Sequence, residues 1–115
     1  MNTRSRKNKG KRLQNKVRDL LLEQFKDVLE QDDVRSTTMG ESGEDIQLSP
    51  AARKLIPYAI ECKNQESLNI WKAYEQATEN SGDYEPVCFI KRNNQKPLVV
   101  VDAEYFVRLH NELVD

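Results

Sequence analysis

The stretch YAIECKNQE, residues 58–66, decides how we interpret the fold, because apolar and polar residues alternate along its first half. Ile60 and Cys62 take one set of alternate positions, and Glu61 and Lys63 take the other. Alternate residues of a β-strand lie on the same face. We therefore expect a strand that buries one face and carries an acid and a base on the other.

Two explanations fit that second face. If it meets water, Glu61 and Lys63 form an ordinary surface salt bridge, which stabilises a protein little. If it does not, the two charges belong to a site that carries out chemistry. For the ECK triplet alone, the salt bridge is the better explanation.

The composition indicates a single domain that is not a membrane protein. The chain has 115 residues, of which 32% are charged, and this length suits one domain. No apolar run approaches the ~20 residues of a membrane span. Its basic N-terminus precedes no apolar segment, so we expect a cytoplasmic protein without a secretory signal. Cys62 and Cys88 lie in apolar runs without a CxxC spacing, which favours reduced, buried thiols.

Charge is distributed unevenly along the chain. Residues 1–18 contain eight basic residues and no acidic one, so the other 97 residues hold ten basic and nineteen acidic residues, a net charge of −9. Such a basic segment is typical of nucleic-acid binding, because it releases counterions from phosphates. The alternative is a solvated tail. We expect residues 1–9 to be a disordered basic arm and residues 10–115 to form the domain.

The pattern of apolar residues predicts four helices and four strands. The long helix between the second and third strands indicates a crossover with parallel or mixed pairing, and the last two strands form a hairpin. The fold class is therefore α/β, a layered domain with a central mixed sheet of about four strands flanked by helices. The expected helices are 11–30, a short one from Pro50, 67–81 and 103–113; the strands are 45–49, 58–63, 86–92 and 97–101, with a loop at 32–44.

Two helix starts are also visible in the sequence. Ser49 is expected to cap the short helix, with Pro50 at its first position. Asp102 is expected to cap the last helix. The residues of that helix expected to face inward are Phe106, Leu109 and Leu113.

A second acid changes the interpretation of the ECK triplet. If strands 45–49 and 58–63 are neighbours, Asp45 and Glu61 converge, with Lys63 beside them. Two close carboxylates repel each other, and a divalent cation such as Mg²⁺ relieves the repulsion. Such an ion polarises a phosphoryl oxygen and activates water, while a lysine neutralises charge on the phosphate. The group predicts a phosphodiester-hydrolysing site.

The wider pattern resembles the PD-(D/E)xK nuclease superfamily. The motif GED (43–45) precedes ECK (61–63), and a helix with EQA (75–77) follows. Together with the basic start GKRLQNKV (10–17), this is similar to archaeal-type Holliday-junction resolvases and related small phage endonucleases. The resemblance implies a restriction-endonuclease-like fold in a single nuclease domain, acting in the cytoplasm, that of the host if the chain is phage-encoded.

The resemblance also implies roles for particular residues. Asp45 and Glu61 would be metal ligands together with the backbone carbonyl of Cys62, with Mg²⁺ as the ion and Mn²⁺ as a substitute. Lys63 would be the catalytic lysine, and Gln76 would support the site from its helix.

Two positions depart from the family pattern. Glu44 stands where the family has proline, which is a minor change. Many resolvases have a glutamate in the first helix, and the matching position here is Gln14, whose neutral amide cannot supply the same charge. Glu23 or Glu41 are the candidates to replace it.

The sequence therefore predicts a Mg²⁺-dependent DNA endonuclease that cuts branched, Holliday-junction-like DNA, as a homodimer that matches a two-fold substrate. The alternatives are a nickase or restriction-like enzyme on duplex DNA, and a non-catalytic DNA-binding module that keeps the fold. The residues expected to contact DNA are Arg4, Arg6, Lys7, Lys9, Lys11, Arg12, Lys16, Arg53 and Lys72.

Overall fold

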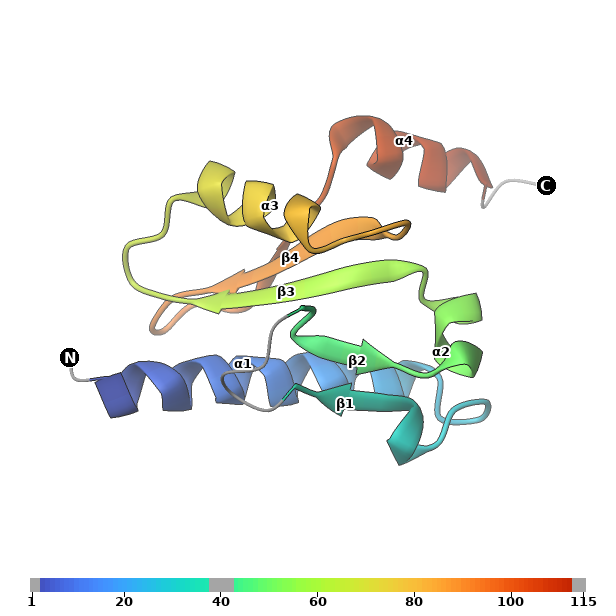
Figure 1. The fold of residues 1–115 in the computed structure, drawn as a ribbon, viewed down its shortest axis with the longest axis horizontal. Helices are drawn as coiled ribbons and strands as arrows, with labels where there is room; N and C mark the ends of the chain where they lie inside the picture. Colours follow the sequence, from blue (N-terminus) through green and yellow to red (C-terminus); the bar gives the residue numbers. More distant parts are fainter. Residues whose placement is uncertain (1–2, 38–42, 113–115) are drawn as a thin grey trace.

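A computed structural model describes residues 3–37 and 43–112 as an α/β protein with four α-helices and two small β-sheets (Figure 1). No helix in these two ranges is both long enough and apolar enough to cross a membrane. In chain order the elements are α1 (Thr3–Gln24), the 3₁₀ turn η1 (Gln31–Asp33), β1 (Val34–Ser36), β2 (Ile46–Leu48), α2 (Pro50–Leu55), β3 (Tyr58–Asn64), α3 (Ile70–Glu79), β4 (Glu85–Lys91), β5 (Leu98–Val100) and α4 (Ala103–Glu112).

The larger sheet has the order β3-β4-β5. Strand β3 pairs with β4 in parallel, with Glu61 opposite Cys88, and α3 makes the crossover between them. Strand β4 pairs with β5 in the antiparallel sense. The predicted crossover and hairpin are therefore confirmed, and β3 is left as an edge strand on its other side.

The smaller sheet corrects the prediction of one mixed sheet of about four strands. Strand β1 lies within the segment 32–44 that we expected to be a loop, and it pairs antiparallel with β2. Val34 is the only apolar residue among its three, so no pair of apolar residues marks a buried face, which explains why it was missed. Strand β2 approaches β3 only at its start, where the Asp45 backbone N–H donates to the Ile60 carbonyl (2.9 Å).

Helices α1 and α3 lie on opposite faces of the larger sheet (Figure 1). On the α1 side, Leu13 and Val17 belong to one buried cluster with Ile60 and Cys62 of β3. On the α3 side, the small residues Ala73 and Ala77 pack with Cys88 in a second cluster. Both cysteines are buried and free, as predicted.

Helix α1 begins earlier and ends earlier than the periodicity predicted. It includes most of the segment 1–9 that we expected to be a disordered arm, because arginine and lysine are good helix formers. Asn64 Nδ2 donates to the Lys9 carbonyl (2.9 Å), which ties this part of α1 to β3. The helix ends at Gln24, so Val28, which falls within the range expected to be helical, lies beyond it and is exposed.

The predicted helix starts are confirmed by their caps. Ser49 Oγ accepts from the Ala52 backbone N–H (3.1 Å), with Pro50 at the first position of α2. Asp102 Oδ1 accepts from the Tyr105 backbone N–H (3.0 Å) at the start of α4.

The inward face of α4 differs from the prediction. Phe106 is 51% exposed, whereas the Tyr105 hydroxyl donates to the Tyr58 hydroxyl (2.9 Å) and the two rings meet edge to face. Leu109 is half-buried, and Leu113 lies outside the described residues. The contact with the sheet that fixes this face of α4 is therefore made by Tyr105 and Tyr58.

Candidate functional site

Asp45 lies at the junction of the two sheets. Its backbone N–H donates to the Ile60 carbonyl, and its carbonyl accepts from the Thr37 N–H, both at 2.9 Å. Its side chain accepts a hydrogen bond from the Cys62 backbone N–H at Oδ2 (2.7 Å). The Cys62 backbone N–H therefore holds the Asp45 carboxylate against the edge of β3. This is the strand that we expected to carry chemistry.

Glu61 projects from the α3 side of β3 and is buried, with 4% of its surface exposed. This burial excludes the wet sheet face on which the salt-bridge explanation depended. Burial, followed by the negative charge of Asp45, raises the pKa of Glu61 from 4.5 to about 7. The structure thus brings the Asp45 carboxylate close enough to raise the pKa of Glu61.

Lys63 and Cys62 complete this group. The charge of Lys63, on the same face of β3, lowers the pKa of Glu61, but less than Asp45 raises it. The Cys62 thiol is buried in the core, and this burial raises its pKa far above the ordinary value. The N–H and C=O of one strand residue point to the same side, so the Cys62 carbonyl faces the same edge as Asp45.

The amide that holds Glu61 is Asn80, which the sequence did not identify. Asn80 Nδ2 donates to Glu61 Oε1 (2.9 Å), and this bond lowers the pKa of Glu61. Gln76, the helix amide that the resemblance implied, lies one turn earlier on α3 and is exposed. The spacing of four residues, which puts both on one helical face, was the signal available for Asn80.

Gln14, the position at which the resemblance leads us to expect a glutamate, is level with the candidate site. Helix α1 runs opposite to β3 (Figure 1), and Asn64 bonds Lys9. At about 1.5 Å per helical residue and 3.3 Å per strand residue, Gln14 is level with Cys62. Gln14 is 5% exposed, and its Oε1 has no hydrogen-bond partner in the described part of the chain.

Glu23 and Glu41 were the two residues expected to replace this acid. Glu23 is exposed, pairs with Lys26 (3.2 Å), and lies about 14 Å farther along α1 than Gln14. Glu41 lies outside the described residues.

The donor set fits a magnesium ion. In residues 3–37 and 43–112, no group of three or more histidine, cysteine, aspartate or glutamate side chains is placed to hold a metal. Mg²⁺, however, is usually bound by one or two carboxylates and keeps several waters. Asp45 and Glu61 are such a pair; burial is the main cause of the raised pKa of Glu61, and repulsion by Asp45, which a cation would relieve, is the next.

Comparisons of the chain with protein-family models, with curated proteins and with solved structures found no match. The function must therefore be argued from the geometry of this site.

The basic residues predicted to contact DNA differ in how far their side chains are exposed. Lys9 is only 6% exposed, which speaks against a phosphate contact, and Lys11 Nζ donates to the Thr37 carbonyl (3.2 Å). Lys72 is exposed on α3. The remaining exposed members lie along α1: Arg4, Arg6, Lys7, Arg12 and Lys16.

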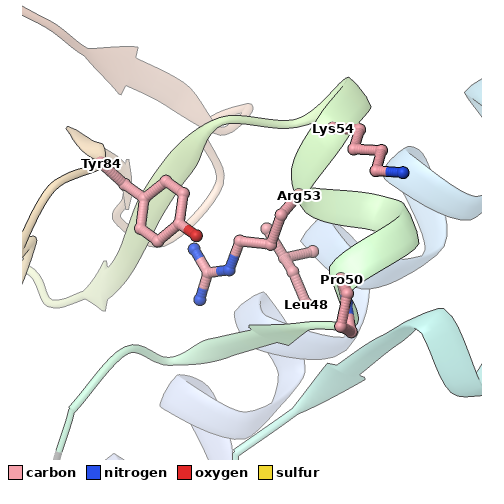
Figure 2. Close-up of a pocket in the computed structure, with 5 residues that line it drawn as sticks. All are labelled: Leu48, Pro50, Arg53, Lys54 and Tyr84. Carbon is pink, nitrogen blue, oxygen red and sulfur yellow. The ribbon is translucent and has the colours of Figure 1, made fainter.

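Arg53 is held in a fixed position beside the site. Its guanidinium donates to Glu44 Oε2 (2.6 Å) and to the Tyr58 carbonyl (3.1 Å), and lies 4.1 Å from the centre of the Tyr84 ring. Figure 2 shows Arg53 extending from α2 towards Tyr84, while Lys54 points the other way. With Leu48 and Pro50 these residues line a pocket of about 460 Å³. Glu44 therefore anchors an arginine.

Substituting Asn80 by alanine is expected to raise the pKa of Glu61 above its wild-type value of about 7, because a bond that stabilises the ionised carboxylate is lost. Titration of the Glu61 carboxyl carbon by NMR measures this change. Gln76→Ala, one turn earlier on the same helix, is the matched control and should leave the titration unchanged. A larger effect at Gln76 than at Asn80 contradicts the assignment.

Proposed function

We propose that this chain is a metal-dependent DNA endonuclease that hydrolyses phosphodiester bonds in branched DNA. The observation that carries the proposal is the convergence of Asp45 and Glu61, sixteen residues apart, at the free edge of β3. The proposal includes a restriction-endonuclease-like arrangement, which is compatible with the parallel β3–β4 pair and its α3 crossover.

The residues that would hold Mg²⁺, or Mn²⁺ in its place, are Asp45, Glu61 and the Cys62 backbone carbonyl. When bound, the ion supplies a Lewis acid for a phosphoryl oxygen and lowers the pKa of a water. The chain holds these ligands by hydrogen bonds: the Cys62 backbone N–H donates to the Asp45 carboxylate, and the Asn80 side-chain amide donates to Glu61. Ligands held in advance need no reorganisation during the reaction.

Lys63 has the role of a positive charge beside the reacting phosphate. It shares a face of β3 with Glu61 and stabilises negative charge that builds on the phosphoryl oxygens. The Cys62 thiol takes no part as a nucleophile, because burial keeps it protonated.

Substrate binding is assigned to the exposed basic residues of α1. They form a stretch without acidic residues, so the DNA backbone would gain affinity there by releasing counterions. A homodimer with a two-fold axis would match the symmetry of a four-way junction.

Replacing Lys63 by methionine is expected to reduce the rate of DNA cleavage about 100-fold, because the charge facing the phosphate is lost. The assay incubates a labelled four-way junction and its linear arms with Mg²⁺ or Mn²⁺. Lys91→Met is the matched control, since Lys91 is also a half-buried strand lysine but donates to the Arg92 carbonyl. It should cut at the wild-type rate.

The outcomes of this assay separate the candidates. Cleavage of the junction in preference to its arms supports the branched substrate, whereas equal cleavage supports a nickase or restriction-like enzyme on duplex DNA. If wild type cuts neither, or if Lys63→Met cuts both as well as wild type does, the enzyme proposal is wrong.

The second candidate, a non-catalytic DNA-binding module, is favoured by one observation. The neutral side chain of Gln14 is level with the site, where the resemblance leads us to expect a further acid. Such a module would bind DNA, cut none, and gain little thermal stability from Mg²⁺.

A further inference from the structure

A polar hollow of about 430 Å³ lies beside the acid pair. Its lining includes Asn80, which donates to Glu61, and Glu44, which precedes Asp45. Two arginines, Arg35 and Arg53, also line it. The hollow therefore brings positive charge next to the two carboxylates of the candidate site.

The pairing of β1 with β2 places Arg35 in the lining of the hollow. Arg35 is opposite Gln47 in the antiparallel register, so the two side chains lie on the same face of the small sheet. Both residues line the hollow. The position of Arg35 could not be inferred from the sequence, because β1 itself was not predicted.

The charges of the hollow do not cancel. Arg53 is paired with Glu44 (2.6 Å), whereas Arg35 is exposed and forms no ion pair within residues 3–37 and 43–112. Among the described residues that line the hollow, two arginines and one glutamate leave a net charge of +1. An arginine without a carboxylate partner, beside a polar hollow, is suited to bind a phosphate through two parallel hydrogen bonds.

Arg35 also connects the hollow to α1. It lines a second groove, of about 550 Å³, together with Lys11 and Arg18 of that helix. Arg35 therefore lies between the hollow and this groove, whose lining also includes Asp19, Asp32, Leu22 and Val34.

We propose that this hollow binds a phosphate of the DNA strand next to the bond that is cut, and that Arg35 is the residue that contacts it. The inference rests on the proposed function for its ligand, but it concerns binding and not cleavage. It adds a phosphate contact outside the acid pair and outside the exposed lysines and arginines of α1.

The test measures binding of a labelled four-way junction in EDTA over a series of NaCl concentrations. Arg35→Ala is expected to weaken binding about tenfold and to reduce the slope of log K against log[salt] by about 1, because one phosphate contact is lost. Arg35→Lys should restore the slope, since it restores the charge. Arg108→Ala, which removes an exposed arginine on α4, is the matched control and should change neither quantity.

The outcomes distinguish this inference from the proposed function. If wild type binds and cuts DNA but Arg35→Ala has the wild-type salt slope, the phosphate site is wrong and the nuclease stands. If Arg35→Ala lowers the slope while wild type cuts no DNA with Mg²⁺, the phosphate site stands and the nuclease is wrong. Equal losses in the Arg35 and Arg108 variants overturn the site, because net charge alone then explains the binding. Thermal melting shows whether each variant is folded.

Discussion

Replacing Asp45 by asparagine is expected to reduce the rate of DNA cleavage about 100-fold or more, because half of the acid pair that would hold Mg²⁺ is lost. The substitution should leave the fold intact. The asparagine carbonyl can still accept the hydrogen bond from the Cys62 backbone N–H, which now goes to Asp45 Oδ2. The expected loss is therefore chemical and not a consequence of unfolding.

The same variant has a second, independent readout. The negative charge of Asp45 raises the pKa of Glu61, so the pKa of Glu61 should fall when that charge is removed. Carbon NMR of the Glu61 carboxyl measures this in the absence of any metal. A Glu61 titration that does not move in Asp45→Asn contradicts the proposed contact between the two acids, whatever happens to cleavage.

Asp102→Asn is the matched control. Asp102 also accepts a backbone N–H bond, from Tyr105 at the start of α4, and asparagine caps helices as well as aspartate does. This variant should cut DNA at the wild-type rate. Equal losses of cleavage at positions 45 and 102 contradict a specific role for Asp45.

Local signals were sufficient to predict several elements of the fold. Ser49 and Pro50 marked the start of α2, Asp102 marked the start of α4, and alternation predicted β3 to within one residue. These signals are properties of short segments. The long helix between two apolar strands also predicted the parallel β3–β4 pair, because a crossover needs such a length.

The parts that were missed depend on contacts between distant segments. Strand β1 exists because it pairs with β2, and its three residues contain no periodicity of their own. The inward face of α4 is decided by the position of Tyr58, which lies far away in the sequence. The helix over residues 3–10 depends in part on the bond from Asn64 to Lys9.

The candidate site shows the same division. Asp45 and Glu61 were predicted to meet if their strands were neighbours in one sheet. The strands belong to different sheets, but the structure still brings the two acids together at the edge of β3. Asn80 and Arg35 were not found. Asn80 follows the last residue of α3 and acts only through its contact with Glu61, and Arg35 enters the hollow through a register set by β2.

Glu61 makes the folded chain less stable as pH rises. Below pH 4.5, Glu61 is protonated in both the folded and the unfolded chain, so it contributes no pH dependence. Between pH 4.5 and about 7, the unfolded chain releases this proton while the folded chain retains it. The free energy of unfolding therefore falls through this range, by about 3 kcal/mol at most, and the loss is complete above about pH 7.

Replacing Glu61 by glutamine is accordingly expected to stabilise the fold at pH 8 while it abolishes cleavage. The neutral amide can keep the bond from Asn80 Nδ2 at its oxygen, and its nitrogen can donate to Asp45 where wild type has repulsion. The gain should be about 2–3 kcal/mol at pH 8 and should vanish near pH 4. Urea unfolding at a series of pH values measures it, and Glu79→Gln, an exposed glutamate at the end of α3, controls for net charge.

Magnesium connects this stability effect to the proposed function. An ion that binds only the folded chain raises the free energy of unfolding. At pH 8, Mg²⁺ should therefore stabilise wild type, whose ionised acid pair attracts it, and should have little effect on Glu61→Gln. If Glu61→Gln is no more stable than wild type at pH 8, the ionised Glu61 does not destabilise the folded chain. If Mg²⁺ stabilises both chains equally, it binds elsewhere. The proposed metal site would account for a buried glutamate whose ionisation is expected to lower the stability of the fold at neutral pH.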